Sequence, residues 1–221
     1  MPWIDIANGE SGLSVRNKLN TIGASVGATS HDPHISGNWY IPQGMHTVGV
    51  SSAGNVDLVT LCPFVLDRAV TISDLGLRIT TGVAVTGLAQ AAIYAHNAAT
   101  GRPTGVALAA TGDLAATAAG VVTGDIIGAN VTLQPGKYWM AGNNNDTLIA
   151  WVTPIININS NVGEMIGSAT AANVLPGNNA QLLGVKATQV FGTWPDLTSA
   201  SFTEMIAGVG NCPPIVIFKV V

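Results

Sequence analysis

The stretch Val131-Thr132-Leu133-Gln134-Pro135-Gly136-Lys137-Tyr138-Trp139-Met140 decides the fold class. Two apolar residues flank a threonine, a Gln-Pro-Gly turn follows, and an aromatic run begins directly after the turn. Short runs rich in β-branched and aromatic residues, separated by Pro and Gly turns, are typical of antiparallel strands. The stretch therefore predicts one strand on each side of a tight turn.

The same pattern recurs along most of the chain, in residues 75–79, 91–96, 147–152 and 215–220. No sustained helical period follows residue 27. The alanine-rich run 106–119, which contains Gly112 and lies between Gly105 and Gly120, suits either a helix or strands and turns. Residues 157–205 are rich in asparagine and glycine, so we expect long surface loops around one or two weaker strands. Loops on a rigid scaffold are where binding usually occurs.

Charge is scarce in this chain. Of its 221 residues, 8 are basic and 12 are acidic, which is 9% charged, whereas 48% are hydrophobic. Ordinary globular domains carry roughly 25% charged residues. Disorder needs low hydrophobicity and high net charge, so the chain should fold. An obligate oligomer explains the composition best, because much of each subunit's surface becomes interface.

The same composition argues against nucleic acid and membrane partners. The eight basic residues are scattered singly, so we expect no nucleic acid binding. Residues 79–101 lack Asp, Glu, Lys and Arg, but threonine, glutamine, histidine, asparagine and glycine interrupt them, and we expect no membrane insertion. Asp5 and Glu10 stand where a signal peptide would need a basic segment and an apolar run.

The first 27 residues differ from the rest. Ser11 can cap a short helix over 13–22. Its apolar residues, spaced 4, 3 and 4 apart, form a seam that consists of Val15, Leu19, Ile22 and Val26. This spacing suits several copies of the helix meeting on an axis. Arg16 is expected on the solvent-facing side of the helix. An amphipathic helix packed on its own domain is the alternative. Residues 28–37 read as a linker, so we expect an attachment segment over 1–37 and a β domain over 38–221.

No constellation in the sequence predicts an enzyme or a cofactor. Residues 23–27 match G-x-S-x-G, but a predicted helix precedes Ser25 where a nucleophile elbow needs a strand. His31 and His34 are weak metal candidates, because two ligands cannot close a tetrahedral site and a polar linker explains them. The run 143–146, Asn-Asn-Asn-Asp, is interpreted as a turn and not as a calcium site. We expect Cys62 and Cys212 to be buried, reduced thiols, with their pairing left open.

Trp151 and Trp194 are the candidate receptor contacts. Exposed tryptophans form platforms for sugars or proteins. Burial in the core or in a subunit interface is the alternative for each of them.

Three groups of residues together resemble proteins of tailed bacteriophages. Residues 8–20 resemble a segment of tail-fibre and other fibre-like proteins. Residues 71–79, 92–95, 101–103, 133–139 and 214–220 are similar, in the same order, to landmarks of phage jelly-roll domains, whereas 157–205 match no landmark. The resemblance implies an N-terminal segment that anchors a trimer to the particle and a jelly roll that forms the distal contact module.

These expectations combine into one hypothesis. The chain is expected to be an all-β jelly-roll sandwich with a helical attachment segment, and a homotrimeric fibre, spike or head-decoration subunit on the virion surface. It would contact other virion proteins, of the capsid or the tail, through residues 1–27. A module that binds a host receptor or surface polysaccharide is the second hypothesis. A glycan hydrolase, with Glu164 and Glu204 as its carboxylates, is the third.

Overall fold

The computed structural model describes residues 34–42, 51–53, 56–154, 182–206 and 212–221. The chain divides into two compact units, Met1–His34 and Ile35–Val221. The helix expected over 13–22, with its seam, lies outside the described residues. The described strands all belong to the second unit.

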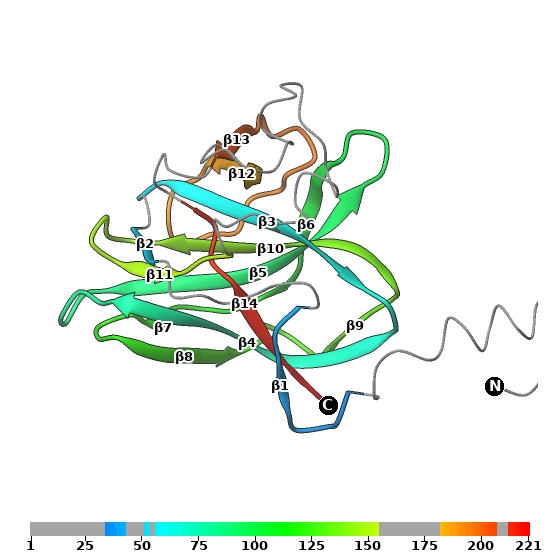
Figure 1. Ribbon diagram of the computed structural model, residues 1–221, viewed down its shortest axis with the longest axis horizontal. Coiled ribbons are helices and arrows are strands. Elements are labelled where there is room, and N and C mark those ends of the chain that lie inside the picture. The colour runs from blue at the N-terminus through cyan, green and yellow to red at the C-terminus, as the bar shows by residue number, and fades with distance from the viewer. Residues whose placement is uncertain (1–33, 43–50, 54–55, 155–181, 207–211) are drawn as a thin grey trace, which may run out of the picture. The chain divides into compact units, whose positions relative to one another are not determined.

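The described part of the second unit is all-β, as the sequence predicts, and its strands form two antiparallel sheets (Figure 1). Sheet A contains β1 (Trp39–Tyr40), β2 (Ser51–Ala53), β4 (Val70–Thr81), β8 (Gly120–Asp125), β9 (Val131–Leu133), β11 (Ala150–Val152) and β14 (Val216–Val220). Sheet B contains β3 (Leu58–Leu66), β5 (Leu88–Asn97), β6 (Arg102–Ala110), β7 (Leu114–Ala115), β10 (Gly136–Asn144), β12 (Leu182–Thr188) and β13 (Thr203–Ile206).

The long strand β4 organises sheet A. It pairs with β14 and β11 along one edge and with β8 and β9 along the other. Its alternating residues Leu75, Leu77 and Ile79 are buried, whereas Arg78 is exposed. A period of two places these three apolar side chains on one face of the sheet. This face packs toward sheet B, as the sequence pattern of 75–79 predicts.

The central strands of sheet B are buried on both faces. In β10, Met140 joins the main core shared with sheet A, while Trp139 and Ala141 join a second apolar cluster. In β5, Ile93 belongs to the main core and Tyr94 to the second cluster. The second cluster is covered by residues of the segment 190–202 that follows β12, including Leu197, which is buried in it. Two layers of apolar side chains, one on each face, therefore hold sheet B in place.

Three segments refine or correct the sequence-based expectations. The alanine-rich run 106–119 contains the end of β6 and the short β7, and its described residues hold no helix. Within 157–205, β12 is not a weak surface strand but an interior strand between β3 and β13, and most of its residues are buried. The strand expected over 147–152 begins only at Ala150. For β12, pairing with β3, which is distant in sequence, supplies the burial.

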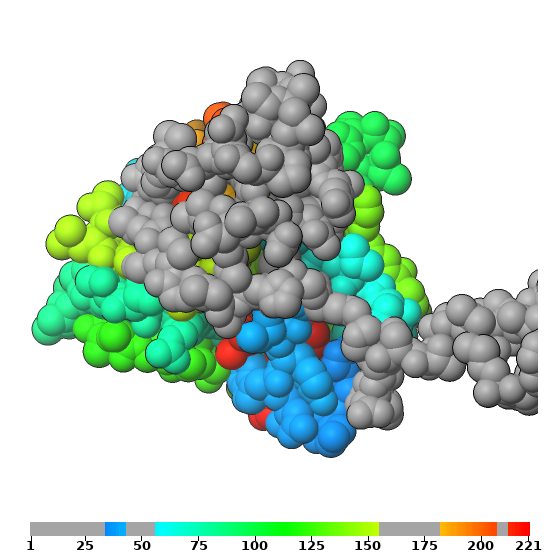
Figure 2. Space-filling view, viewed as in Figure 1, coloured from blue at the N-terminus to red at the C-terminus, as the bar shows by residue number. Residues whose placement is uncertain are grey.

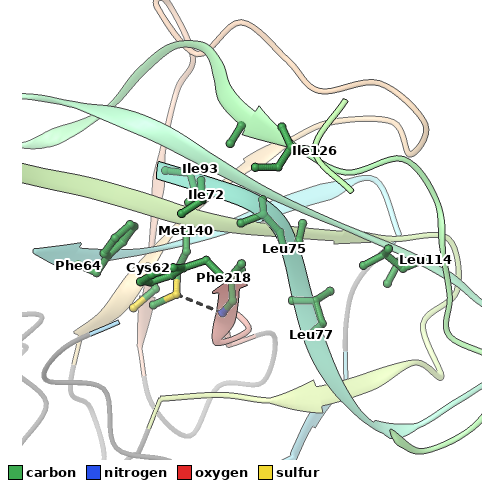
Figure 3. Packing of buried hydrophobic residues seen from close by; sticks show 14 of the residues in the cluster. Cys62, Phe64, Ile72, Leu75, Leu77, Ile93, Leu114, Ile126, Met140 and Phe218 are labelled. Atoms are coloured by element: carbon green, nitrogen blue, oxygen red, sulfur yellow. Dashed lines mark hydrogen bonds between the residues drawn. The ribbon is translucent and has the colours of Figure 1, made fainter. Parts of the chain in front are cut away.

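The thioether of Met140 accepts a hydrogen bond in the main core. The backbone N–H of Val216 in β14 lies 3.3 Å from Met140 Sδ, the dashed line in Figure 3. Met140→Leu keeps the volume but removes the acceptor, so we expect a loss of about 1–2 kcal/mol in the free energy of unfolding. Urea denaturation measures it, and Met205→Leu in β13, also buried, is the control. Equal effects of the two substitutions would show that the sulfur contact contributes nothing.

Candidate functional site

The outer face of sheet B carries a group of aromatic side chains. Tyr94 from β5 and Trp139 from β10 point to this face: both belong to the second cluster, whereas the adjacent Ile93 and Met140 belong to the main core. Trp194 stacks edge-on against Tyr94, with ring centroids 6.2 Å apart. His96 stacks on Trp139 at the same centroid distance. We call Tyr94, His96, Trp139 and Trp194 the aromatic site.

The polar atoms of the aromatic site fasten the covering segment. Tyr94 Oη donates to the Pro195 carbonyl at 3.0 Å, and Trp194 Nε1 donates to the Thr111 carbonyl at 3.3 Å. The Leu197 N–H adds a bond of 2.9 Å to the Gly105 carbonyl. Burial, with nearby Asp196 as the smaller cause, raises the pKa of Tyr94. Tyr94 therefore stays a neutral donor, which suits a structural role.

His96 accepts a hydrogen bond and is therefore held neutral. Trp139 Nε1 donates to His96 Nδ1 at 3.1 Å, so the ring proton belongs on Nε2. Burial, followed by the nearby Lys137 ammonium, lowers the pKa of His96. A protonated imidazole has no acceptor, so protonation removes this bond. The aromatic site thus contains a hydrogen bond that protonation of His96 removes.

Acidification should weaken the domain through His96. Its pKa is lower in the folded than in the unfolded chain, so its stabilising contribution is complete above the ordinary histidine pKa and is lost as pH falls below it. We expect a lower urea midpoint at pH 5 than at pH 7. His96→Gln keeps an acceptor oxygen but does not titrate, so the difference should shrink. An unchanged pH dependence in this variant would rule out His96 as the cause.

Two carboxamides lie beside the aromatic site on the same face. Asn143 of β10 stands opposite Gln90 of β5 in the strand register, and both are buried. Gln90 Nε2 donates to Asp113 Oδ1 at 2.8 Å. Gln90 Oε1 and both polar side-chain atoms of Asn143 have no hydrogen-bond partner among the described residues. This pair offers amide groups that a bound hydroxyl group would satisfy.

The two predicted receptor contacts are in different environments. Trp151 is 1% exposed and belongs to the main core, where its Nε1 donates to the Cys212 carbonyl at 2.9 Å. This burial corrects the expectation that Trp151 contacts a receptor, and it agrees with the core alternative. Trp194 is half-buried at the aromatic site, so part of its indole reaches the surface. Only Trp194 is kept as a contact candidate.

Of the other residues singled out in the sequence, some lie in the described ranges and some lie outside them. His34 is described, whereas His31, Val15, Arg16, Leu19, Ile22 and Val26 lie outside the described residues. In the described ranges no three His, Cys, Asp or Glu side chains are grouped as a metal site. Of the Asn-rich run predicted as a turn, Asn143 and Asn144 belong to β10, and only Asn145 and Asp146 lie in the connection that follows. Asn145 Oδ1 accepts from the Leu88 N–H, and its Nδ2 donates to the Thr86 carbonyl. Among the hydrolase carboxylates, Glu164 is not described, and Glu204 pairs with Arg102 at 3.3 Å.

Cys62 and Cys212 are buried, as predicted, and no disulfide joins them. Burial, with the neighbouring Cys212 as a smaller cause, raises the pKa of the Cys62 thiol. Because the thiolate is the reactive form, Cys62 should be chemically inert in the folded chain.

Sequence reasoning missed Tyr94, His96, Gln90 and Asn143 as members of one site. A signal existed in β5, where Gln90, Ala92, Tyr94 and His96 alternate with small or aliphatic residues. The sequence pattern of β5, however, indicates a strand with only one buried face. The segment 190–202, which covers its other face, is far away in sequence. The site could be assembled only once the pairing of β5 with β10 was known.

The comparisons with known proteins identify no relative. No protein-family model matches the chain, and no curated protein is significantly similar to it. In the part of the chain that the structure describes, no helix is long and apolar enough to cross a membrane.

Proposed function

We propose that the chain is a structural subunit of a tailed-bacteriophage virion and does not act as an enzyme. It associates as a homotrimer through residues 1–27 and carries a jelly-roll domain on the virion surface as a fibre, spike or head-decoration module. One observation carries the assembly part of this proposal: a chain with 9% charged residues also exposes twelve large hydrophobic side chains among its described residues. Copies that cover one another remove such surface from water.

The arrangement of the aromatic site supports a structural role. The donors Tyr94 and Trp194 and the acceptor His96 all form hydrogen bonds with groups of the same chain. The bonds of Tyr94 and Trp194 hold the 190–202 segment in place. A domain with two cores and a fastened cover resists local opening, which suits a particle exposed to the environment. The jelly-roll topology and the phage context come from the resemblance of residues 8–20 and of the strand landmarks.

The attachment role is tested by one substitution in the N-terminal seam and one beside it. Leu19→Asp places a charge in the seam, and Asn17→Asp places the same charge outside it. We expect Leu19→Asp, like deletion of residues 1–27, to abolish incorporation into particles, while Asn17→Asp is incorporated normally. Quantitative immunoblotting of purified particles measures this. Normal incorporation of the deleted chain would refute attachment through this segment.

A polysaccharide-binding module is the second candidate. Partly exposed Trp194 and the buried amides of Gln90 and Asn143 lie on the same face, and sugars bind by stacking on aromatic rings and by hydrogen bonds to amides. Screening host surface polysaccharides tests it. Binding that is lost in Trp194→Ala but kept in Trp39→Ala would favour this function over pure decoration.

A further inference from the structure

The strand that begins the second unit carries an exposed apolar surface. Ile35, Trp39, Ile41 and Val221 are exposed by 61%, 38%, 45% and 46%. We call these four side chains the β1 patch. They lie close together because Gly37 N–H donates to the Val220 carbonyl at 2.8 Å and Trp39 pairs with Lys219. Figure 2 shows residues 35–42, in blue, at the surface with C-terminal residues, in red, beside them.

The strand register places most of the patch on one face. Tyr40 and Phe218 are register partners whose rings stack toward the main core. Phe218 and Val220 of β14 both belong to the main core, so the residues that alternate with them and with Tyr40 point to the opposite, outer face of sheet A: Trp39, Ile41, Lys219 and Val221. The charge of Lys219 is compensated by Asp74, 3.6 Å away in β4. The outer corner of sheet A is thus apolar, with its one ammonium paired.

The position of the β1 patch indicates what covers it. The patch begins directly after His34, the last residue of the first unit. Eight residues separate the end of the predicted seam, Val26, from Ile35. An extended chain advances at most about 3.5 Å per residue, so this stretch of chain can span at most roughly 30 Å. Copies joined at the seam hold their β1 patches near one another at high effective concentration.

We propose that the β1 patch is the surface through which the β domain packs against a second copy of this chain. The inference rests on the proposed self-association and adds the domain surface that takes part in it. Segment 35–42 contains no Asp, Glu, Lys or Arg, so two copies can approach without burying an unpaired charge from this segment. Trp39 supplies the large aromatic anchor that interfaces favour.

Cysteine cross-linking of the full chain tests the proposal. Cys62 and Cys212 are buried, so a surface cysteine is the accessible thiol among the described residues. Ile41→Cys places one in the patch, and Ile35→Cys is a second probe. Val106→Cys is the matched control, because Val106 is 65% exposed on β6 at an edge of the other sheet. Each variant is treated with a short bis-maleimide after its thermal unfolding is shown to match the wild type.

We expect Ile41→Cys and Ile35→Cys to give covalent dimers on a denaturing gel, and Val106→Cys to stay monomeric. If the wild type is an oligomer by mass but neither patch variant links, or if Val106→Cys links equally well, the β1 patch is not the interface while self-association stands. If the wild type is a monomer by mass, the proposed self-association itself fails, and the inference fails with it.

Discussion

Gly184→Ala is expected to unfold the β domain or to leave it barely stable. Gly184 lies in β12, and a Cβ at this position would overlap the carbonyl oxygen of Leu61 in the neighbouring strand β3. The overlapped atom is backbone in the middle of sheet B, so no side-chain rotation relieves it. We expect a loss of at least about 3 kcal/mol in the free energy of unfolding, against a total of about 5–15 kcal/mol for a domain.

Urea denaturation followed by tryptophan fluorescence measures the effect of Gly184→Ala. The midpoint should fall by more than about 1 M if a folded state survives. Gly112→Ala is the matched control, because no atom lies within 4 Å of the Cβ it would add. A midpoint for Gly184→Ala within error of that for Gly112→Ala would contradict the close approach of β12 to β3.

Trp151→Ala should cost about 4 kcal/mol, within the usual range for a buried tryptophan. The indole is 1% exposed in the main core, and its removal also leaves the Cys212 carbonyl without its donor at 2.9 Å. Trp151→Phe retains most of the apolar volume but not the donor, so it should lie between the wild type and Trp151→Ala.

Trp194→Ala is the comparison for Trp151→Ala, because Trp194 is half-buried and covers the second cluster from outside. We expect it to cost less than about 2 kcal/mol. Urea midpoints at pH 7 rank the variants. If Trp194→Ala were the more destabilising, the assignment of one tryptophan to the core and the other to the surface would be wrong.

The all-β class was predictable because its signals are local. Alternation in 75–79 and the Gln-Pro-Gly turn at 134–136 indicate strands without any knowledge of their partners, and β4, β9 and β10 lie where they indicate. Strand β12 was harder, because it is buried on both faces and so loses the alternation of a half-buried strand. Its apolar residues, interrupted by Gly184, also follow an asparagine-rich stretch that looks like loop.

The aromatic site was less predictable than the strands. Trp139 and Met140 are adjacent in sequence but belong to different cores, and composition does not reveal a second core. The cover from 190–202 is a long-range contact that depends on tertiary packing. Trp151 was predicted at the surface or in the core, and the choice depended on the pairing of β11 with β4, which brings Trp151 beside Ile79.

The mass of the full chain in solution tests the central claim most directly, since scarce charge, exposed apolar side chains and the N-terminal seam are all explained by copies that cover one another. Sedimentation equilibrium at micromolar concentration should give three times the 22.5 kDa of one chain. A stable, soluble species of 22.5 kDa that persists as the concentration rises would contradict the account.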